Sequence, residues 1–211
     1  MPLRFVLVAL VPLLFGCGPG SPSNMPSTLI TPSGITSNAT PADATASVSH
    51  LMKASGDVLV NLMDACDPET FNAPPPAGVG PGTCVRNGGV TFQNFIEQLT
   101  KFGSIGAWHM APPNSNLVVG QHFLAVNHGG EVHTFTEVKE FGGGRVAPLN
   151  AILHLTTVAP ECAALDPTAH PEDFIAPGAT FQSDTEEEEG DEKYQCCIHP
   201  WMRLTAHVRE K

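Results

Sequence analysis

Toward its C-terminal end, the sequence reads Cys196-Cys197-Ile198-His199-Pro200-Trp201-Met202. A thiol, an imidazole and a thioether follow one another there with the spacing Cys-x2-His-x2-Met. If a strand ends at Cys196 and a tight turn follows, these three side chains meet at one point. Two His with one Cys and a weak axial Met form a mononuclear copper site. The segment therefore predicts three copper ligands and requires one more histidine from elsewhere.

His133 supplies the missing ligand, within Asn127-His128-Gly129-Gly130-Glu131-Val132-His133-Thr134-Phe135. A strand, an Asn, a glycine-containing turn and a His followed by a small polar residue resemble the upstream ligand segment of the cupredoxins, which are small blue copper proteins. Pro177 to Phe181, the acidic turn and Tyr194-Gln195-Cys196 resemble that family's penultimate hairpin. The ligand loop is most similar to that of amicyanin and plastocyanin-like members. The resemblance extends from about Ala107 to Val208.

This resemblance implies an all-β fold, a cupredoxin-like Greek-key β-sandwich over residues 107–211, with one type 1 copper. The implied copper ligands are His133, Cys196, His199 and Met202. It further implies that Thr134 bridges the two ligand segments. Pro200 and Trp201 would shield the edge of His199, and that edge would be the electron port.

The first residues have the pattern of a secretory signal. In residues 1–16, Arg4 precedes an apolar run that is too short to span a bilayer. Leu14-Phe15-Gly16-Cys17 resembles the lipobox of bacterial lipoproteins, in which the Cys is acylated; ordinary signal-peptidase cleavage nearby is the alternative. Residues 17–46, rich in Ser, Thr, Pro, Gly and Ala, would form a flexible linker. We expect an exported, lipid-anchored protein that faces the periplasm or the cell surface.

The remaining cysteines indicate two disulfides. Cys197 stands where the family normally has another residue type. Consecutive strand residues face opposite sides, so only one of the two adjacent sulfurs can face the metal, and the spacing selects Cys196. Four cysteines then remain, with three possible connectivities. We expect Cys66–Cys84, closing a Pro/Gly-rich loop, and Cys162–Cys197, pinning the long insertion over residues 140–174 to the back of the ligand strand.

Charge excludes one class of partner. The formal charge is −11, with only 10 Lys and Arg, and this disfavours nucleic acid because phosphate neutralisation needs basic residues. The acidic surplus is concentrated at Asp184, Glu186, Glu187, Glu188, Glu189, Asp191 and Glu192. Such a run favours a solvated turn, with a docking patch for a basic partner as the alternative.

Periodicity divides the rest of the chain. Residues 47–106 form an N-terminal extension in which 47–64 is a short helix or an opening strand, 66–89 is a loop and 91–102 is a helix. The aromatic stripe of this helix is expected to pack in the core. Gly142-Gly143-Gly144 is expected to be a flexible turn near the site. Short strands are predicted at 108–111, 117–119, 122–126, 132–138, 151–157, 180–182, 192–196 and 205–208.

These features predict one-electron transfer with redox partner proteins that the sequence does not identify. Copper binding or delivery without redox turnover is a second hypothesis. A non-redox interaction module on the same scaffold is a third, because a fold does not fix a function. No Ser-His-Asp order or paired-carboxylate pattern is evident, so we do not expect an enzyme.

Overall fold

The computed structural model describes residues 56–184, 186 and 188–210. The predicted signal over residues 1–16, the lipidated Cys17, the linker and the first residues of the N-terminal extension lie outside this part of the chain. Two four-stranded mixed sheets make up the described fold. The all-β class predicted from the sequence is therefore confirmed.

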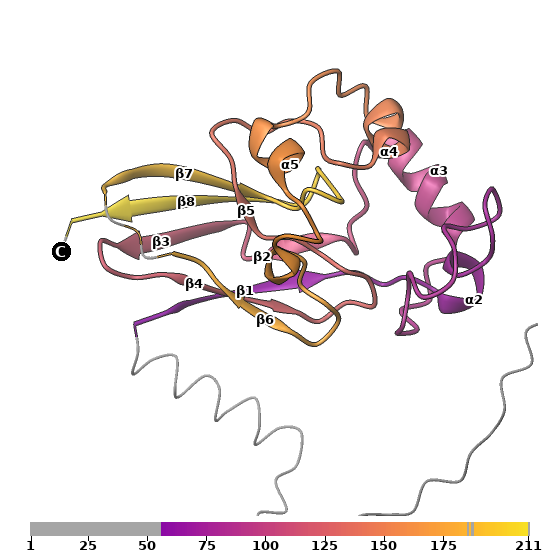
Figure 1. Ribbon diagram of the computed structural model, residues 1–211, viewed down its shortest axis with the longest axis horizontal. Coiled ribbons are helices and arrows are strands. Elements are labelled where there is room, and N and C mark those ends of the chain that lie inside the picture. Colours follow the sequence, from indigo (N-terminus) through magenta and orange to yellow (C-terminus); the bar gives the residue numbers. More distant parts are fainter. Residues whose placement is uncertain (1–55, 185, 187, 211) are drawn as a thin grey trace, which may run out of the picture. The chain divides into compact units, whose positions relative to one another are not determined.

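The two sheets form the layers of a sandwich (Figure 1). The first sheet has the order β2-β1-β4-β6, with β1 at Val58–Met63, β2 at His109–Ala111, β4 at Phe123–Asn127 and β6 at Thr180–Gln182. The second has the order β3-β8-β7-β5, with β3 at Asn114–Val118, β5 at Thr136–Glu137, β7 at Gly190–Gln195 and β8 at Arg203–Arg209. Among consecutive strands, only β1–β2 and β7–β8 share a sheet. The repeated crossing between layers is the connectivity of a Greek-key sandwich.

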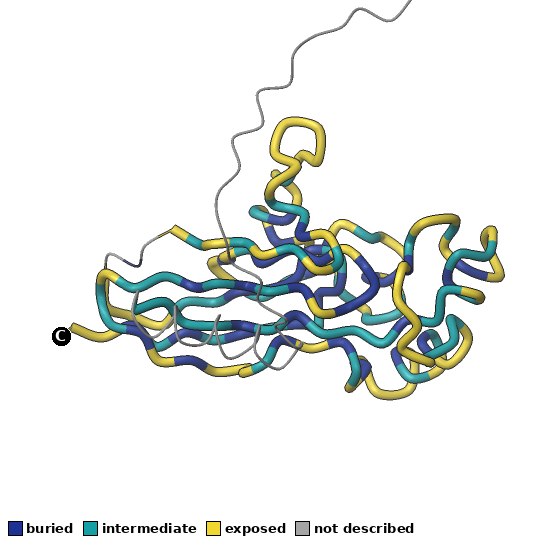
Figure 2. The backbone as a smooth tube through the Cα atoms, turned by 90° about the horizontal axis from the view of Figure 1, so that it is seen from below, coloured by how far each residue is buried: buried dark blue, intermediate teal, exposed yellow. Residues whose placement is uncertain are grey.

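Strand alternation builds the core between the sheets. Burial alternates along β8, where Leu204, Ala206 and Val208 are buried and the residues between them are partly exposed. Burial also alternates along β1, β3 and β4, and Figure 2 shows buried and partly exposed stretches following one another along the strands. From the first sheet, Phe123 contacts the Tyr194 ring of the second sheet with ring centroids 5.2 Å apart. Period-two patterning therefore orients the apolar faces toward each other.

The first strand corrects the predicted domain boundary. β1 pairs in parallel with β4 and antiparallel with β2, so it lies inside the first sheet. The boundary predicted at residue 107 therefore does not separate an extension from the sandwich. The sequence around β1 was compatible with either a helix or a strand. The structure has a strand there, in which Val60 and Leu62 are buried.

Seven of the eight predicted strands overlap observed ones, although the strand predicted over 132–138 shortens to β5. The strand predicted over 151–157 is wrong. That segment contains the end of helix α4 (Ala147–Ile152) and a loop. Pro148 lies in the first turn of α4, where its missing N–H is tolerated and its fixed φ favours the helix. The insertion also holds α5 (Pro160–Ala164) and a 3-10 turn, η1 (Pro171–Asp173).

Helix α3 (Phe92–Phe102) confirms the helix predicted over 91–102. The Thr91 hydroxyl accepts a hydrogen bond from Asn94 N, and Gly103 ends the helix with φ 69°. Phe95 and Leu99 are buried, whereas Phe102 is exposed. Within the predicted loop, a short helix α2 (Pro68–Phe71) begins at its cap Asp67. No helix in the described part of the chain is both long and apolar enough to span a bilayer.

One residue of the acidic run departs from the expected solvated turn. Glu186 is buried, and its Oε1 accepts a hydrogen bond from the Tyr194 hydroxyl at 2.6 Å. Glu192 Oε2 lies 3.3 Å from the same hydroxyl. Partial burial and the hydrogen bond and negative charge of Glu186 raise the pKa of Glu192 to about 8.

Glu192 predicts a pH dependence of folding stability. Because the folded-state pKa lies above the unfolded value, the folded state holds a proton that the unfolded chain has lost, and stability falls as pH rises from about 4.5 to 8. Glu192→Gln should therefore stabilise the protein more at pH 8 than at pH 5. Urea unfolding at both pH values measures this difference. An equal effect at both values, or the same pattern in Glu189→Gln on the exposed turn, would contradict it.

Candidate metal centre

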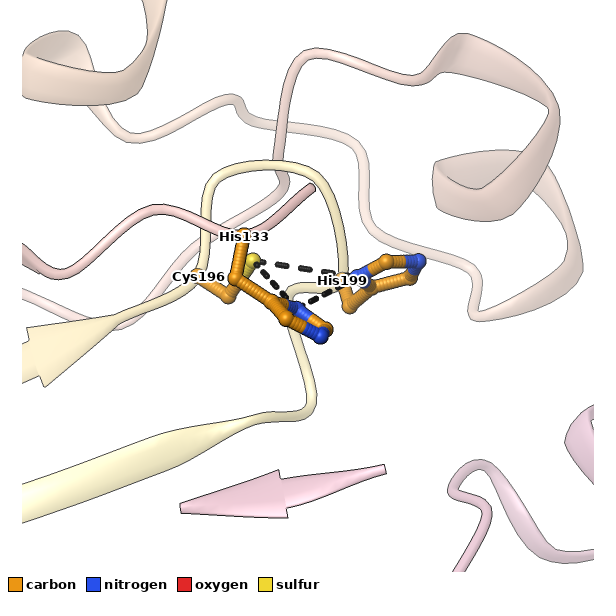
Figure 3. Close-up of side chains that lie close together, drawn as sticks. All are labelled: His133, Cys196 and His199. Atoms are coloured by element: carbon orange, nitrogen blue, oxygen red, sulfur yellow. Dashed lines mark hydrogen bonds between the residues drawn. The ribbon is translucent and has the colours of Figure 1, made fainter. Parts of the chain in front are cut away.

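Three of the four predicted ligands meet at one buried point (Figure 3). Cys196 Sγ lies 3.8 Å from His133 Nδ1 and 3.8 Å from His199 Nδ1. The two Nδ1 atoms are 3.3 Å apart. The three atoms thus form a nearly isosceles triangle, with both imidazoles presenting the same nitrogen.

This triangle has the size of a metal coordination plane. A point in its plane is equidistant from all three atoms at about 2.1 Å, within the range of metal bonds to imidazole nitrogen and thiolate sulfur, about 2.0–2.3 Å. The donor set of two His and one Cys in a trigonal arrangement is that of mononuclear copper sites with a weak axial ligand. The residues present therefore fit a single copper ion.

The β7–β8 connection positions Cys196 and His199 through its own backbone. Cys196 follows β7 directly, and its N–H donates to the Met202 carbonyl at 3.0 Å. The Met202 N–H donates to the His199 carbonyl at 2.9 Å, which closes a tight turn. The sequence spacing thus becomes a loop whose ends are tied together, as predicted.

His133 is positioned by a separate segment. Its backbone exchanges two hydrogen bonds with Ile175, at 3.1 and 2.7 Å. The buried amide of Asn127 donates to the carbonyls of Glu131 and Ile175, both at 2.8 Å, and accepts from Gly129 N. The loop that carries His133 is therefore held from both sides, and Asn127 is a structural residue whose role the sequence did not reveal.

Thr134 joins the two ligand segments, as expected. Its Oγ1 accepts a hydrogen bond from Cys197 N at 2.7 Å, and its own N–H donates to Cys196 Sγ at 3.4 Å. Cys197 faces the other way and forms the predicted disulfide with Cys162. Among the described cysteines, only Cys196 is free. The second predicted disulfide, Cys66–Cys84, is also present.

Met202 is buried at 0% exposure beside this loop. Its backbone completes the turn, and its axial role remains a prediction. Pro200 is also buried and lies near Gly144, where an added Cβ would collide with the Cys197 carbonyl and approach the Pro200 ring. Pro200 therefore lies beside the glycine run, and its shielding of the His199 edge remains a prediction.

The glycine run near the site is held rather than loose. Gly142 N donates to Gln195 Oε1 at 3.0 Å and Gly143 N to the Thr157 carbonyl at 2.7 Å. Gly144 N donates to the Asn150 side chain at 2.8 Å. The predicted flexible turn is thus a fixed support, because close approach to the ligand loop excludes side chains there and the backbone donors are satisfied.

The edge of His199 does not form an open port. His199 is only 2% exposed, because Trp108, Trp201 and the α3 residue Phe95 cover that end of the sandwich. The Trp201 ring meets His199 edge-on with centroids 5.4 Å apart, and Phe95 lies 5.8 Å from Trp201. The sequence predicted the shielding by Trp201. It did not predict closure by the segment between β1 and β2.

Two buried carboxylates, which the sequence analysis missed, face the histidines. Asp64 Oδ2 lies 2.8 Å from His133 Nε2, and Glu131 Oε2 lies 3.6 Å from His199 Nε2. Burial opposes ionisation of Asp64, but hydrogen bonds from His133 and two backbone N–H groups lower its pKa to about 2. Burial raises the pKa of Glu131 above its ordinary value. No local spacing links either carboxylate to the ligand motifs.

The electrostatics favour a thiolate at Cys196. Burial opposes ionisation, but the hydrogen bonds and positive charges of His133 and His199 hold the pKa of Cys196 well below its ordinary value. Burial likewise opposes the charged form of His133, and its bonds with Asp64 and Cys196 outweigh this and raise the pKa to about 9. A deprotonated sulfur is the form that binds a metal.

Other described histidines lie apart from the donor triangle. His128, which the sequence placed near the upstream ligand, is exposed and bonds to Asn61 at 2.9 Å. His122, His170 and His207 face the carboxylates Asp57, Glu172 and Asp191. These described histidines therefore take no part in the donor triangle.

Comparison with known proteins gives only low similarity. No family model and no curated protein matches the sequence. A purple cupredoxin from Nitrosopumilus maritimus is 22% identical, covers 49% of this chain and 85% of its own, and has a TM-score of 0.33. A reduced Cu(I) form of an amicyanin variant is 21% identical over 50% of this chain and 77% of its own, with a TM-score of 0.32. Plastocyanin from Dryopteris crassirhizoma is 12% identical, and the match covers 72% of this chain and 100% of the plastocyanin chain, with a TM-score of 0.34.

Thr134→Val tests the link between the ligand segments. Valine matches threonine in shape but removes the acceptor of the buried Cys197 N–H, and an unsatisfied buried donor costs about 1–3 kcal/mol. We expect the free energy of unfolding in urea to fall by that amount. Thr134→Ser retains the oxygen and should lose less. An unchanged free energy of unfolding in Thr134→Val would show that the hydrogen bond does not stabilise the link.

Proposed function

We propose that this chain is an exported mononuclear copper protein that acts in one-electron transfer. The observation that carries the proposal is the triangle of Cys196 Sγ, His133 Nδ1 and His199 Nδ1, whose size fits one ion. The resemblance of its ligand segments to those of cupredoxins supports the same assignment. Met202, buried beside the ligand loop, would be the weak axial ligand.

A fixed ligand shell suits electron transfer. Copper held there would supply one-electron chemistry by cycling between Cu(II) and Cu(I). The chain's contribution is to keep the donors still: the Thr134 bond, the Met202 turn and the Cys162–Cys197 disulfide restrain both ligand segments. Burial also excludes water from the site. Little movement then accompanies each change of charge.

Burial favours a carrier over a delivery protein. His133, Cys196 and Met202 are 0% exposed and His199 is 2% exposed. Transfer of the ion to another protein would require a donor atom of that protein to reach the copper, and the aromatic layer over His199 blocks this approach. An electron requires no such opening. A non-redox interaction module would not need a thiolate and two imidazoles at coordination distance.

The cellular setting is part of the proposal. The pattern of residues 1–17 supports export and acylation of Cys17, so the domain would be tethered to the membrane surface by a lipid and the linker over residues 17–46. The redox partners would then be proteins of the periplasm or cell surface. We propose no enzymatic reaction. The carboxylates at the site face the ligand histidines, and in the second group of potential ligands, Asp64, Cys66 and Glu131, the sulfur is already part of the Cys66–Cys84 disulfide.

Loading with Cu(II) should give an intense visible band from thiolate-to-copper charge transfer. Cys196→Ser should abolish the band, because the sulfur donor is lost. Visible absorption and the electron paramagnetic resonance spectrum measure this directly. The matched control is the double variant Cys162→Ala/Cys197→Ala, which removes the neighbouring disulfide without leaving a free thiol. It should keep the band, and loss of the band there with retention in Cys196→Ser would refute the ligand assignment.

Release kinetics separate a carrier from a delivery protein. We expect reversible one-electron voltammetry and slow loss of Cu(I) to an excess of a chelator, because every donor is buried. Phe95→Ala, which thins the cover over Trp201, should accelerate release; Phe102→Ala, on the exposed side of α3, should not. Rapid loss of Cu(I) from the unmodified protein would favour delivery.

A further inference from the structure

Both ligand histidines are backed by buried carboxylates. Each imidazole turns Nδ1 toward Cys196, so Nε2 points away from the centre. There His133 Nε2 meets Asp64 at 2.8 Å and His199 Nε2 meets Glu131 at 3.6 Å. The side chains of these four residues are at most 7% exposed. The first distance is that of a hydrogen bond, and the second is longer than a hydrogen bond.

Asp64 is held by its own set of donors. Its carboxylate accepts from the backbone N–H groups of Gly130 at 2.8 Å, Glu131 at 3.0 Å and Cys66 at 3.3 Å. A Cβ on Gly129 would collide with the same carboxylate, so this position requires glycine. Asp64, which directly follows β1, therefore fixes the loop that carries His133 as well as the imidazole itself.

Glu131 is fixed in a comparable way. Trp108 Nε1 donates to Glu131 Oε2 at 2.7 Å, and this is the oxygen that faces His199 Nε2. The hydrogen bond from Trp108 favours the ionised carboxylate and opposes the burial that raises its pKa. Among the described residues, neither Asp64 nor Glu131 forms an ion pair with Lys or Arg. Their negative charge is therefore directed at the ligand histidines.

We propose, on the premise of the copper function above, that Asp64 is a positioning residue that orients the ligand His133, and that Asp64 and Glu131 together lower the reduction potential of the site. A ligand histidine bound through Nδ1 must carry its proton on Nε2, and a carboxylate at Nε2 fixes that tautomer and the ring orientation. With a thiolate and two imidazoles, the site has a net charge of +1 with Cu(II) and 0 with Cu(I). Two nearby negative charges in a dry environment stabilise the more positive, oxidised state.

Voltammetry of isosteric variants tests the electrostatic part. Asp64→Asn and Glu131→Gln remove one negative charge each with little change in volume. In each variant we expect the ratio of Cu(I) to Cu(II) at a fixed potential to rise at least tenfold, which is a 59 mV increase for a one-electron couple. Glu188→Gln, which removes the same charge from the exposed turn, should leave the ratio unchanged. Glu131→Asp keeps the charge and should retain most of the lowered potential.

Nuclear magnetic resonance of the unmodified Cu(I) protein tests the positioning part without any variant. The His133 Nε2 proton should be strongly downfield and exchange slowly with water, since Asp64 holds it in a buried hydrogen bond. A His133 Nε2 proton that exchanges rapidly or is absent would overturn the orienting role of Asp64. Unchanged reduction potentials in both Asp64→Asn and Glu131→Gln would overturn the electrostatic role. A protein without the charge-transfer band would instead mean that the copper function itself fails. A protein with the charge-transfer band whose Asp64→Asn and Glu131→Gln variants have unchanged reduction potentials would overturn only the electrostatic role of the two carboxylates.

Discussion

Consecutive residues of an extended chain face opposite sides, and this constraint places Cys196 and Cys197 on opposite sides at the end of β7. Cys196 faces the main core with His133 and His199, whereas Cys197 joins Cys162 in a second small cluster. The end of β7 is thus followed by a free thiol, Cys196, and by a disulfide-bonded cysteine, Cys197. The long insertion can be tied to the ligand loop without using the sulfur that faces the donor triangle. The geometry of the centre depends on this division.

The segment between β1 and β2 supplies an aromatic layer that covers the site. Its aromatic residues Phe71, Phe95 and Trp108 pack on one another, with Phe71 and Trp108 stacked 5.9 Å apart. The layer reaches Trp201 and closes the side of the loop where His199 would otherwise meet solvent. In the proposed electron transfer, an electron that leaves by this route would cross a packed apolar layer. Trp108 of the same layer contacts the carboxylate of Glu131, which is buried, and charges act more strongly in a dry environment than in water.

Short-range spacing made the centre predictable. Cys196 and His199 lie within one turn, so local spacing sufficed for them, and the resemblance of the segment around His133 to the upstream ligand segment of cupredoxins supplied the third donor. Both disulfide pairs were chosen from three possible connectivities. Asp64 is 69 residues from His133 and follows an ordinary alternating strand. Its position is fixed by the parallel pairing of β1 with β4, which no local period reveals. The strand predicted over 151–157 was wrong because of local composition. Its β-branched residues resemble those of a strand, but the segment follows from a helix whose first turn contains Pro148. Burial of Glu186 depended on Tyr194, a partner that charge counting does not consider.

The central claim is that one copper ion binds to His133, Cys196 and His199. X-ray absorption at the copper edge, on protein loaded with one equivalent of copper, tests it most directly. The account predicts one short sulfur scatterer and two imidazole nitrogens, all within about 2.0–2.3 Å of the metal. A copper environment of nitrogen and oxygen without a short sulfur would contradict it.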